Sequence, residues 1–160
     1  LYYEDDTIQH AGVVIGFGGI AGHCFVMQKR GTTGYCHRII CAQDYSAVTA
    51  ACMMVKKSAF DAVNGLSEDL AVAFNDIDFC MKLRQAGYLI VYNPYAELYH
   101  YESISRGLDD QGEKAERYNK ESGHFREKWK AELEAGDPYY NPNFSLDRSD
   151  YALRDPVSGR

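Results

Sequence analysis

The sequence predicts an α/β domain in which helices flank a mixed, mostly parallel sheet. Two observations carry this prediction. The middle of the chain alternates strand-like and helix-like runs, in the order strand, helix, helix, strand, strand, which is typical of sheets covered by helices. The length of 160 residues and the hydrophobic content of 46% suit one globular domain with a sizeable core.

A helix over residues 75–86 is the element with the clearest ends. Asn75 is predicted to be its N-cap, because a side-chain oxygen there accepts a free N–H of the first turn. Asp76 and Asp78 follow in that turn, where the positive end of the helix dipole favours negative charge. Gly87 then supplies the left-handed residue that ends the helix.

Apolar runs predict the strands. They cover residues 11–15, 46–55, 88–92 and 96–103. The run over 46–55 is small and apolar almost throughout, which predicts a strand buried on both faces. A short helix over residues 59–63 is expected after Ser58, its predicted N-cap, and Asn64-Gly65 is expected to end it.

The last third of the chain predicts one more helix. Apolar residues between 115 and 133 recur at helical spacing, so Phe125 and Trp129 are expected to pack on the body of the domain. Gly136 is predicted to end this helix. The polar-aromatic tail over 139–147 has no regular period, and we expect it to lie along the surface.

Composition excludes several classes of partner. The net charge of −6, without any basic cluster, argues against binding of nucleic acid. No apolar run approaches the ~20 residues of a membrane-spanning helix. The cysteines are odd in number and form no C-x-x-C pair, which favours reduced thiols in a cytoplasmic protein over a disulfide framework.

Two short motifs have some features of binding sites. The glycines of Gly16-x-Gly18-x-x-Ala21 follow a strand, as in dinucleotide-binding proteins. A β-like run follows them where that fold needs a helix, so a flexible glycine loop is the expected structure. Cys36-His37 with Cys41 matches no usual zinc spacing, and ordinary residues are expected there.

Two side chains are candidates for chemistry. The N-terminus of a helix favours the ionised form of Asp76, and a general base must be ionised to take a proton from a hydroxyl. His100 lies near the end of the strand predicted to start at Ala96. Ligands of open α/β sheets bind at strand ends and helix N-termini, a geometry in which both residues would face one pocket. The bland alternative is that Asp76 and Asp78 only stabilise the first turn and that His100 is a surface residue.

Several separated blocks, in order along the chain, resemble the second half of the family 2 glycosyltransferases. The bacterial rhamnosyltransferase-like members are the most similar. The blocks are Ile8–Val14, Val48–Val55, Phe74–Cys80, Leu83–Tyr88, Leu98–Ser103 and, in the tail, Asp137–Asn143. Agreement of several blocks in order is more specific than any single motif.

The resemblance implies part of a GT-A fold that transfers a sugar from a nucleotide-sugar to an acceptor hydroxyl with inversion. In the family, the acid of an E/N-D-x-D block is the base, and it matches Asp76. A divalent metal (Mg or Mn) is held by a D-x-D motif in the first half and, in many members, by a His that matches His100. Ser103 and Arg106 are implied contacts of the donor diphosphate. The implied acceptor-binding residues are Thr49, Ala50, Ala51, Asn75 and Asp78.

This sequence departs from the family because the nucleotide-binding half with its D-x-D motif has no counterpart here. We therefore expect residues 1–106 to form the acceptor-and-base half of a catalytic domain, and residues 107–160 a helical and extended C-terminal extension. The chain alone is expected to lack transferase activity, and to need the missing half for metal.

The expected partners are a nucleotide-sugar donor and a glycan or lipid-linked acceptor, with peripheral association of the full-length protein with a membrane. The competing hypothesis is a non-catalytic carbohydrate-binding or interaction module.

Overall fold

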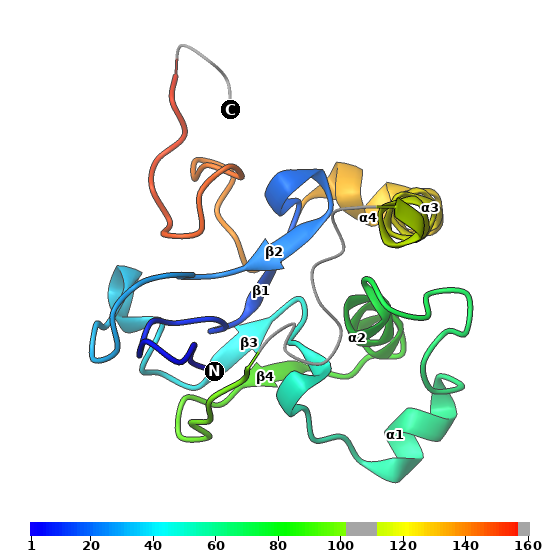
Figure 1. Cartoon of the computed structure of the whole chain (residues 1–160), viewed down its shortest axis with the longest axis horizontal. Coiled ribbons are helices and arrows are strands. Elements are labelled where there is room, and N and C mark those ends of the chain that lie inside the picture. Colours follow the sequence, from blue (N-terminus) through cyan, green and yellow to red (C-terminus); the bar gives the residue numbers. More distant parts are fainter. Residues whose placement is uncertain (102–111, 157–160) are drawn as a thin grey trace.

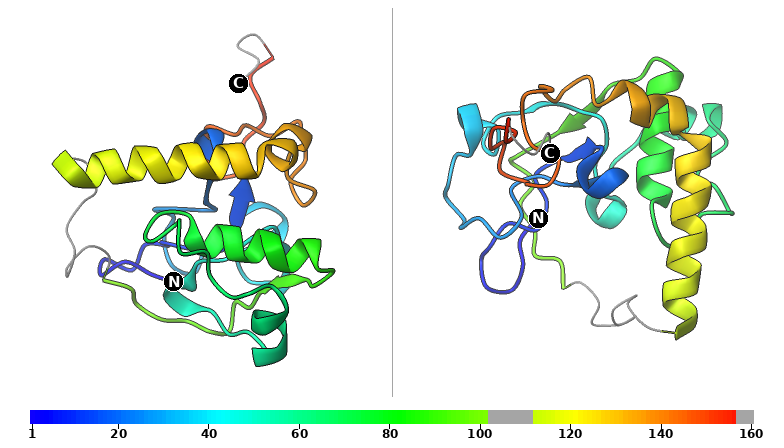
Figure 2. Two further views of the ribbon diagram at one scale, coloured as in Figure 1. Left: turned by 90° about the vertical axis from the view of Figure 1, so that its right-hand side faces the viewer. Right: turned by 90° about the horizontal axis from the view of Figure 1, so that it is seen from above.

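Helices α2 and α3 lie side by side along one flank of a small β-structure in the computed structural model of this chain (Figures 1 and 2). The structure describes residues 1–101 and 112–156. Its strands are β1 (Val13–Ile15), β2 (Ala21–His23), β3 (Gln43–Tyr45) and β4 (Ile90–Tyr92). Its helices are α1 (Lys57–Ala62), α2 (Asn75–Gln85), α3 (Gly112–Lys128) and α4 (Lys130–Ala135), with 3₁₀ turns at Phe17–Gly19, Tyr35–His37 and Ala50–Cys52.

The strands pair as two antiparallel ladders, β1 with β2 and β3 with β4. In these ladders Val14 lies opposite Gly22, and Asp44 lies opposite Val91. We expected mostly parallel pairing. In the described ranges both ladders are antiparallel, and parallel pairing is limited to the isolated bridge between Tyr2 and Tyr99. The ladders do not decide whether the chain is part of a GT-A fold, which stays a prediction.

Strand β1 lies between two hydrophobic clusters. Val13 and Ile15 belong to one cluster together with the buried face of α2, Phe125 and Trp129. Val14 points to the other cluster, because successive side chains of a strand face opposite sides. Of the strand predicted over residues 11–15, residues 13–15 form β1, which is buried on both faces.

Helix α2 confirms the predicted element, and its C-terminus is the predicted one. Gly87 has a φ of +86° and its N–H donates to the Arg84 carbonyl at 2.9 Å, while the N–H of Tyr88 donates to Leu83 at 3.0 Å. These two bonds satisfy carbonyls that the end of a helix leaves open. The predicted N-cap is wrong: Phe74 occupies the cap position, and Asn75 is already the first helical residue.

Helix α1 was also predicted, but it begins earlier than expected. Lys56 is at its cap, and Ser58 lies inside the helix, so the predicted N-cap is wrong. The end is as predicted, because Asn64 and Gly65 both have positive φ and the N–H of Gly65 donates to the Phe60 carbonyl at 2.9 Å.

The strand predicted over 46–55 is wrong. A strand needs a partner on its edge, and in the described residues this segment pairs only at the bridge between Ala47 and Val13. Beyond it the chain forms the 3₁₀ turn at Ala50–Cys52, and Met54 is 100% exposed. The strand predicted over 96–103 is likewise reduced, in its described part, to the bridge at Tyr99.

One C-terminal helix was predicted, and the structure divides it at Trp129 into α3 and α4. The surface position predicted for the tail is wrong for its aromatic residues Tyr140 and Phe144. α3 and α4 bury Phe125 and Trp129 as expected. Tyr140 and Phe144 of the tail, followed by Tyr151, are also buried and complete the second hydrophobic cluster. Burial of these large rings favours a packed tail more strongly than the polar residues between them favour exposure to water. Neither described range contains a helix long and apolar enough to cross a membrane.

Candidate functional site

Asp76 lies in the first turn of α2 with its carboxylate half-buried. Oδ2 accepts a hydrogen bond from the backbone N–H of Ala50 at 3.0 Å, and Oδ1 accepts one from Ile77 at 2.9 Å. A carboxylate offers roughly four lone-pair positions, so these two bonds orient it and leave room to accept a further proton. The dipole of α2 adds a favourable field for its negative charge.

The bond to Ala50 brings the segment 49–51 to the start of α2. Thr49 caps the 3₁₀ turn there, because its hydroxyl accepts the N–H of Ala51 at 3.3 Å. Ala50 and Ala51 are exposed beside the carboxylate, and the neighbouring Asn75 is half-buried. The structure thus groups the residues predicted for the acceptor side around Asp76, with the exception of the Asp78 carboxylate. That they contact an acceptor stays a prediction.

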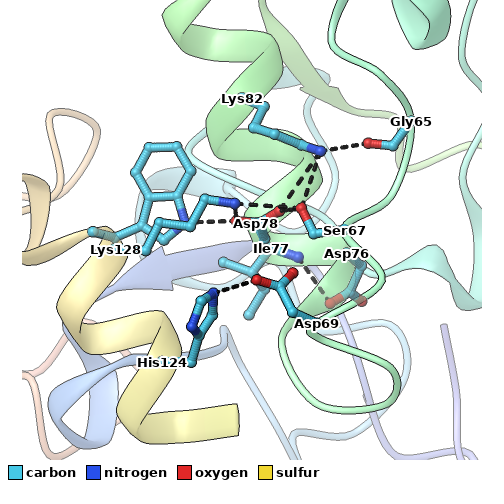
Figure 3. A network of polar contacts seen from close by, with 10 residues as sticks. Gly65, Ser67, Asp69, Asp76, Ile77, Asp78, Lys82, His124 and Lys128 are labelled. Carbon is cyan, nitrogen blue, oxygen red and sulfur yellow. Dashed lines mark hydrogen bonds and ion pairs between the residues drawn. The ribbon is translucent and has the colours of Figure 1, made fainter.

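The carboxylate of Asp78 is 0% exposed and lies in a network that joins α2 to α3 (Figure 3). It accepts hydrogen bonds from the indole N–H of Trp129 at 2.8 Å and from the hydroxyl of Ser67 at 2.6 Å. The ammonium groups of Lys128 and Lys82 lie 2.6 Å and 3.8 Å from its oxygens. All of its acceptor capacity is therefore directed into the protein.

This network determines the charge of Asp78. Burial alone would raise its pKa, but the hydrogen bonds from Lys128, Ser67 and Trp129 outweigh burial and hold the pKa below its ordinary value. Asp78 is thus a buried carboxylate matched by cations, as buried charges must be. Its position suits a residue that supports the first turn of α2.

His100 is anchored from two sides. Its backbone N–H donates to the Tyr2 carbonyl at 3.0 Å, and its ring nitrogen Nδ1 lies 2.8 Å from the side-chain oxygen of Gln9. The hydrogen bonds of Asp76 go instead to Ala50 and Ile77, so no described bond joins the two predicted site residues. Ser103 and Arg106, predicted to contact the diphosphate, lie outside the described residues.

The predicted metal needs ligand donor atoms, and the ring of His100 offers one of them. A histidine whose Nδ1 faces an oxygen has the geometry common among metal ligands, so His100 fits as one ligand. Residues 1–101 and 112–156 contain no group of three or more His, Cys, Asp or Glu that could hold an ion. All five cysteines are free thiols, among them Cys36 and Cys41.

A pocket of about 620 Å³ opens between the segment 52–56 and β4. Its lining is largely apolar and includes Met54 and Leu89, which are exposed. Neither Asp76 nor His100 is among its described lining residues.

The sequence did not reveal the partners of the predicted residues. No pattern in the sequence predicts that Lys128 and Ser67 contact Asp78. Lys82 differs, because it stands four residues after Asp78, a spacing that predicts an ion pair within a helix. Gln9 belongs to the block 8–14, but nothing in its spacing predicts a contact with His100, which is 91 residues away.

Comparison with known proteins gives relatives but no solved structure or family model that matches. The chain is 52% identical over 157 residues to a protein of Sinorhizobium fredii named uncharacterized protein y4gI. It is 33% identical over 156 residues to the O-antigen biosynthesis protein RfbC of Myxococcus xanthus. Over 62 residues, 39% of the chain, it is 37% identical to the N-acetylglucosaminyl-diphospho-decaprenol L-rhamnosyltransferase of Mycobacterium tuberculosis.

The chain spans only 17%, 12% and 20% of these three relatives. The two descriptive names point to a glycosyltransferase-related family.

Proposed function

We propose that this chain is the acceptor-and-base part of an inverting glycosyltransferase that uses a nucleotide-sugar donor. The observation that carries the proposal is the half-buried carboxylate of Asp76, which two backbone N–H groups orient at the start of α2. The names of the RfbC and rhamnosyltransferase relatives support sugar transfer in the biosynthesis of a polysaccharide. The acceptor is a hydroxyl of a glycan or of a lipid-linked sugar.

In the proposed reaction Asp76 takes the proton of the acceptor hydroxyl while the hydroxyl oxygen attacks the anomeric carbon. The nucleoside diphosphate leaves from the opposite face, so the configuration inverts. The N–H of Ala50 holds the carboxylate in position, and the exposed segment 49–51 with Asn75 lines the acceptor side. Asp78 acts as a positioning residue, since Trp129 and Lys128 bind its carboxylate.

Donor binding is assigned mainly to the longer protein. A divalent metal, Mg²⁺ or Mn²⁺, supplies positive charge against the leaving diphosphate when it is bound. His100 would provide one ligand, and Ser103 and Arg106 would contact the phosphate oxygens. Because the chain spans 12–20% of the relatives, the complete reaction is proposed for the longer protein.

The test is Asp76→Asn in that longer protein. The amide keeps the shape of the side chain and one acceptor oxygen, but it cannot take a proton. We expect turnover to fall by about 10²-fold or more, the usual contribution of a general base, with binding of the nucleotide-sugar retained. Asp61→Asn is the matched control, because Asp61 is an exposed acid on α1 that pairs with Lys57.

Unchanged turnover in Asp76→Asn would refute the role of this residue as the base. Tight binding of a glycan by the 160-residue chain, unaffected by the same substitution, would favour the non-catalytic binding module.

A further inference from the structure

The side-chain amide of Gln9 contacts His100 at two points. Its Nε2 donates to the backbone carbonyl of His100 at 3.2 Å, and its Oε1 lies 2.8 Å from the ring nitrogen Nδ1. Gln9 is only 2% exposed, so the amide is fixed by its surroundings. The backbone of His100 is held in addition by its N–H bond to Tyr2.

These contacts determine which ring nitrogen of His100 carries the hydrogen. A backbone carbonyl can only accept, so the end of the Gln9 amide that faces it must be the NH₂ group. The other end is then the oxygen, which also can only accept. Nδ1 of His100 must therefore be the donor, and in the neutral ring the lone pair lies on Nε2.

We propose that Gln9 is a positioning residue that holds neutral His100 in the Nδ1–H form and so presents Nε2 as the electron-pair donor to a divalent cation. The ring nitrogen Nε2 of His100 makes no hydrogen bond to a residue in the described ranges. Histidines that bind metals commonly donate their other N–H to an oxygen, which fixes the ring and raises its basicity. The proposal rests on the proposed function only for the identity of what Nε2 binds.

The same residue provides an internal control. Nδ1 of His23 lies 3.0 Å from the backbone carbonyl of Gln9, so neutral His23 must also carry its hydrogen on Nδ1. A change of the Gln9 side chain removes the anchor of His100 and leaves the anchor of His23 in place.

The experiment compares the 160-residue chain with its Gln9→Met and Gln9→Ala variants by ¹⁵N NMR of the histidine rings at a pH of about 8, where unperturbed imidazole is neutral. Met keeps the volume of Gln without the amide. We expect the Nδ1–H form at both His100 and His23 in the unmodified chain. In both variants His100 should shift toward the Nε2–H form that unrestrained imidazole prefers, while His23 stays unchanged.

An Nε2–H form of His100 in the unmodified chain, or an unchanged His100 in both variants, would overturn the role of Gln9. Titration of the longer protein with Mn²⁺, in its unmodified and Gln9→Met forms, then tests the cation separately, because the other metal ligands are assigned to that protein. The His100 signals should broaden selectively, with an affinity about tenfold or more lower in Gln9→Met, as for loss of an outer-shell partner. No broadening at His100 in the unmodified longer protein would overturn its role as a ligand and the metal part of the proposed function, whereas the tautomer result would still stand.

Discussion

Within the block 8–14, the contacts of individual residues explain which residue type stands at each position. Gln9 binds the ring and carbonyl of His100. The ring of His10 packs edge-on against His23, with centroids 4.8 Å apart, and burial lowers its pKa well below the ordinary value, so this ring is neutral. Gly12 lies directly against the ring of Tyr45. Several residues of this block, which carries part of the family resemblance, are therefore also required by local packing.

Gly12 gives the first prediction at the residue scale. Its φ is +107°, and a Cβ there would lie 2.4 Å from the buried ring of Tyr45. Gly12→Ala should therefore lose about 1–2 kcal/mol of unfolding free energy to backbone strain and a further ~1–3 kcal/mol to overpacking. Gly31 is the matched control: its φ is +86°, and apart from Gly31 and its two chain neighbours no atom lies within 4 Å of the position that an alanine methyl group would take there.

Urea unfolding of both variants measures the difference. Gly31→Ala should show the backbone cost alone, about 1–2 kcal/mol. Equal losses for the two variants would mean that Tyr45 moves aside without cost, and would contradict the packing argument.

At the scale of elements, the buried carboxylate of Asp78 fastens α2 to α3. Its partner Lys128 is the last residue of α3, Trp129 follows it at the junction with α4, and Ser67 comes from the loop before α2 (Figure 3). Because Asp76 lies in the same turn, the network also fixes the direction in which α2 presents its candidate base. A shift of α3 would therefore be felt at the candidate site.

Asp78→Asn tests this fastening. The substitution removes the anionic partner of Lys128, so the free energy of unfolding at pH 7 should fall by about 3 kcal/mol, the usual cost of breaking a buried ion pair. The exposed pair of Asp61 and Lys57 serves as control, and Asp61→Asn should cost less than about 1 kcal/mol. Urea midpoints of the three proteins measure both values.

The same comparison has a defined dependence on pH. The folded chain holds the pKa of Asp78 below the unfolded value of about 3.9. The carboxylate therefore stabilises the fold above that value, and this stabilisation is lost as the pH falls through the lower folded pKa. The difference in unfolding free energy between the unmodified chain and Asp78→Asn should become smaller below a pH of about 4. A difference that does not change with pH would contradict the negative charge assigned to Asp78.

The sequence was informative where the structure is determined locally. The end of α2 depends on one glycine with positive φ, so Gly87 was sufficient to predict it. The strand over 46–55 failed because pairing depends on segments far along the chain, and apolar composition alone does not supply an edge. The cap failed for a related reason: Phe74 adopts a φ of +61°, and its ring packs against Phe125 of α3 at 5.4 Å, a contact that no local pattern contains.

The candidate site shows the same division. Asp76 was found from the acidic first turn of its helix and from the resemblance of its block. Its bond to Ala50 joins residues 26 apart, and the bond from Trp129 to Asp78 joins residues 51 apart. Such partners depend on how helices pack, so they emerge only from the folded chain.

At the scale of the molecule, the segment after residue 112 is part of the core. It supplies Phe125 and Trp129 to one hydrophobic cluster and Tyr140 and Tyr151 to the other. Strand β1 lies between these clusters, so each cluster supports one face of the same strand. We therefore expect the two clusters to unfold together.

Tyr151 tests this coupling. It is 4% exposed, stacks on Phe25 with ring centroids 5.0 Å apart, and its hydroxyl donates to that of Tyr45 at 3.3 Å. Tyr151→Ala should cost about 3–5 kcal/mol of unfolding free energy, as for other large buried rings. Leu153→Ala, at a position that is 74% exposed, should change it by less than about 0.5 kcal/mol.

Hydrogen exchange shows whether the loss reaches the other cluster. Because β1 joins the two clusters, the amide of Val13, which donates to the Ala47 carbonyl at 3.0 Å, should exchange faster in Tyr151→Ala. Tyr151→Phe keeps the ring and loses the hydroxyl contacts with Tyr45 and with the Cys24 thiol. A loss of about 1 kcal/mol of unfolding free energy and little change in the exchange of the Val13 amide are expected. A Tyr151→Ala variant that behaves like Leu153→Ala would mean that the tail does not stabilise the domain. Faster exchange confined to residues near Tyr151 would mean that the two clusters unfold independently.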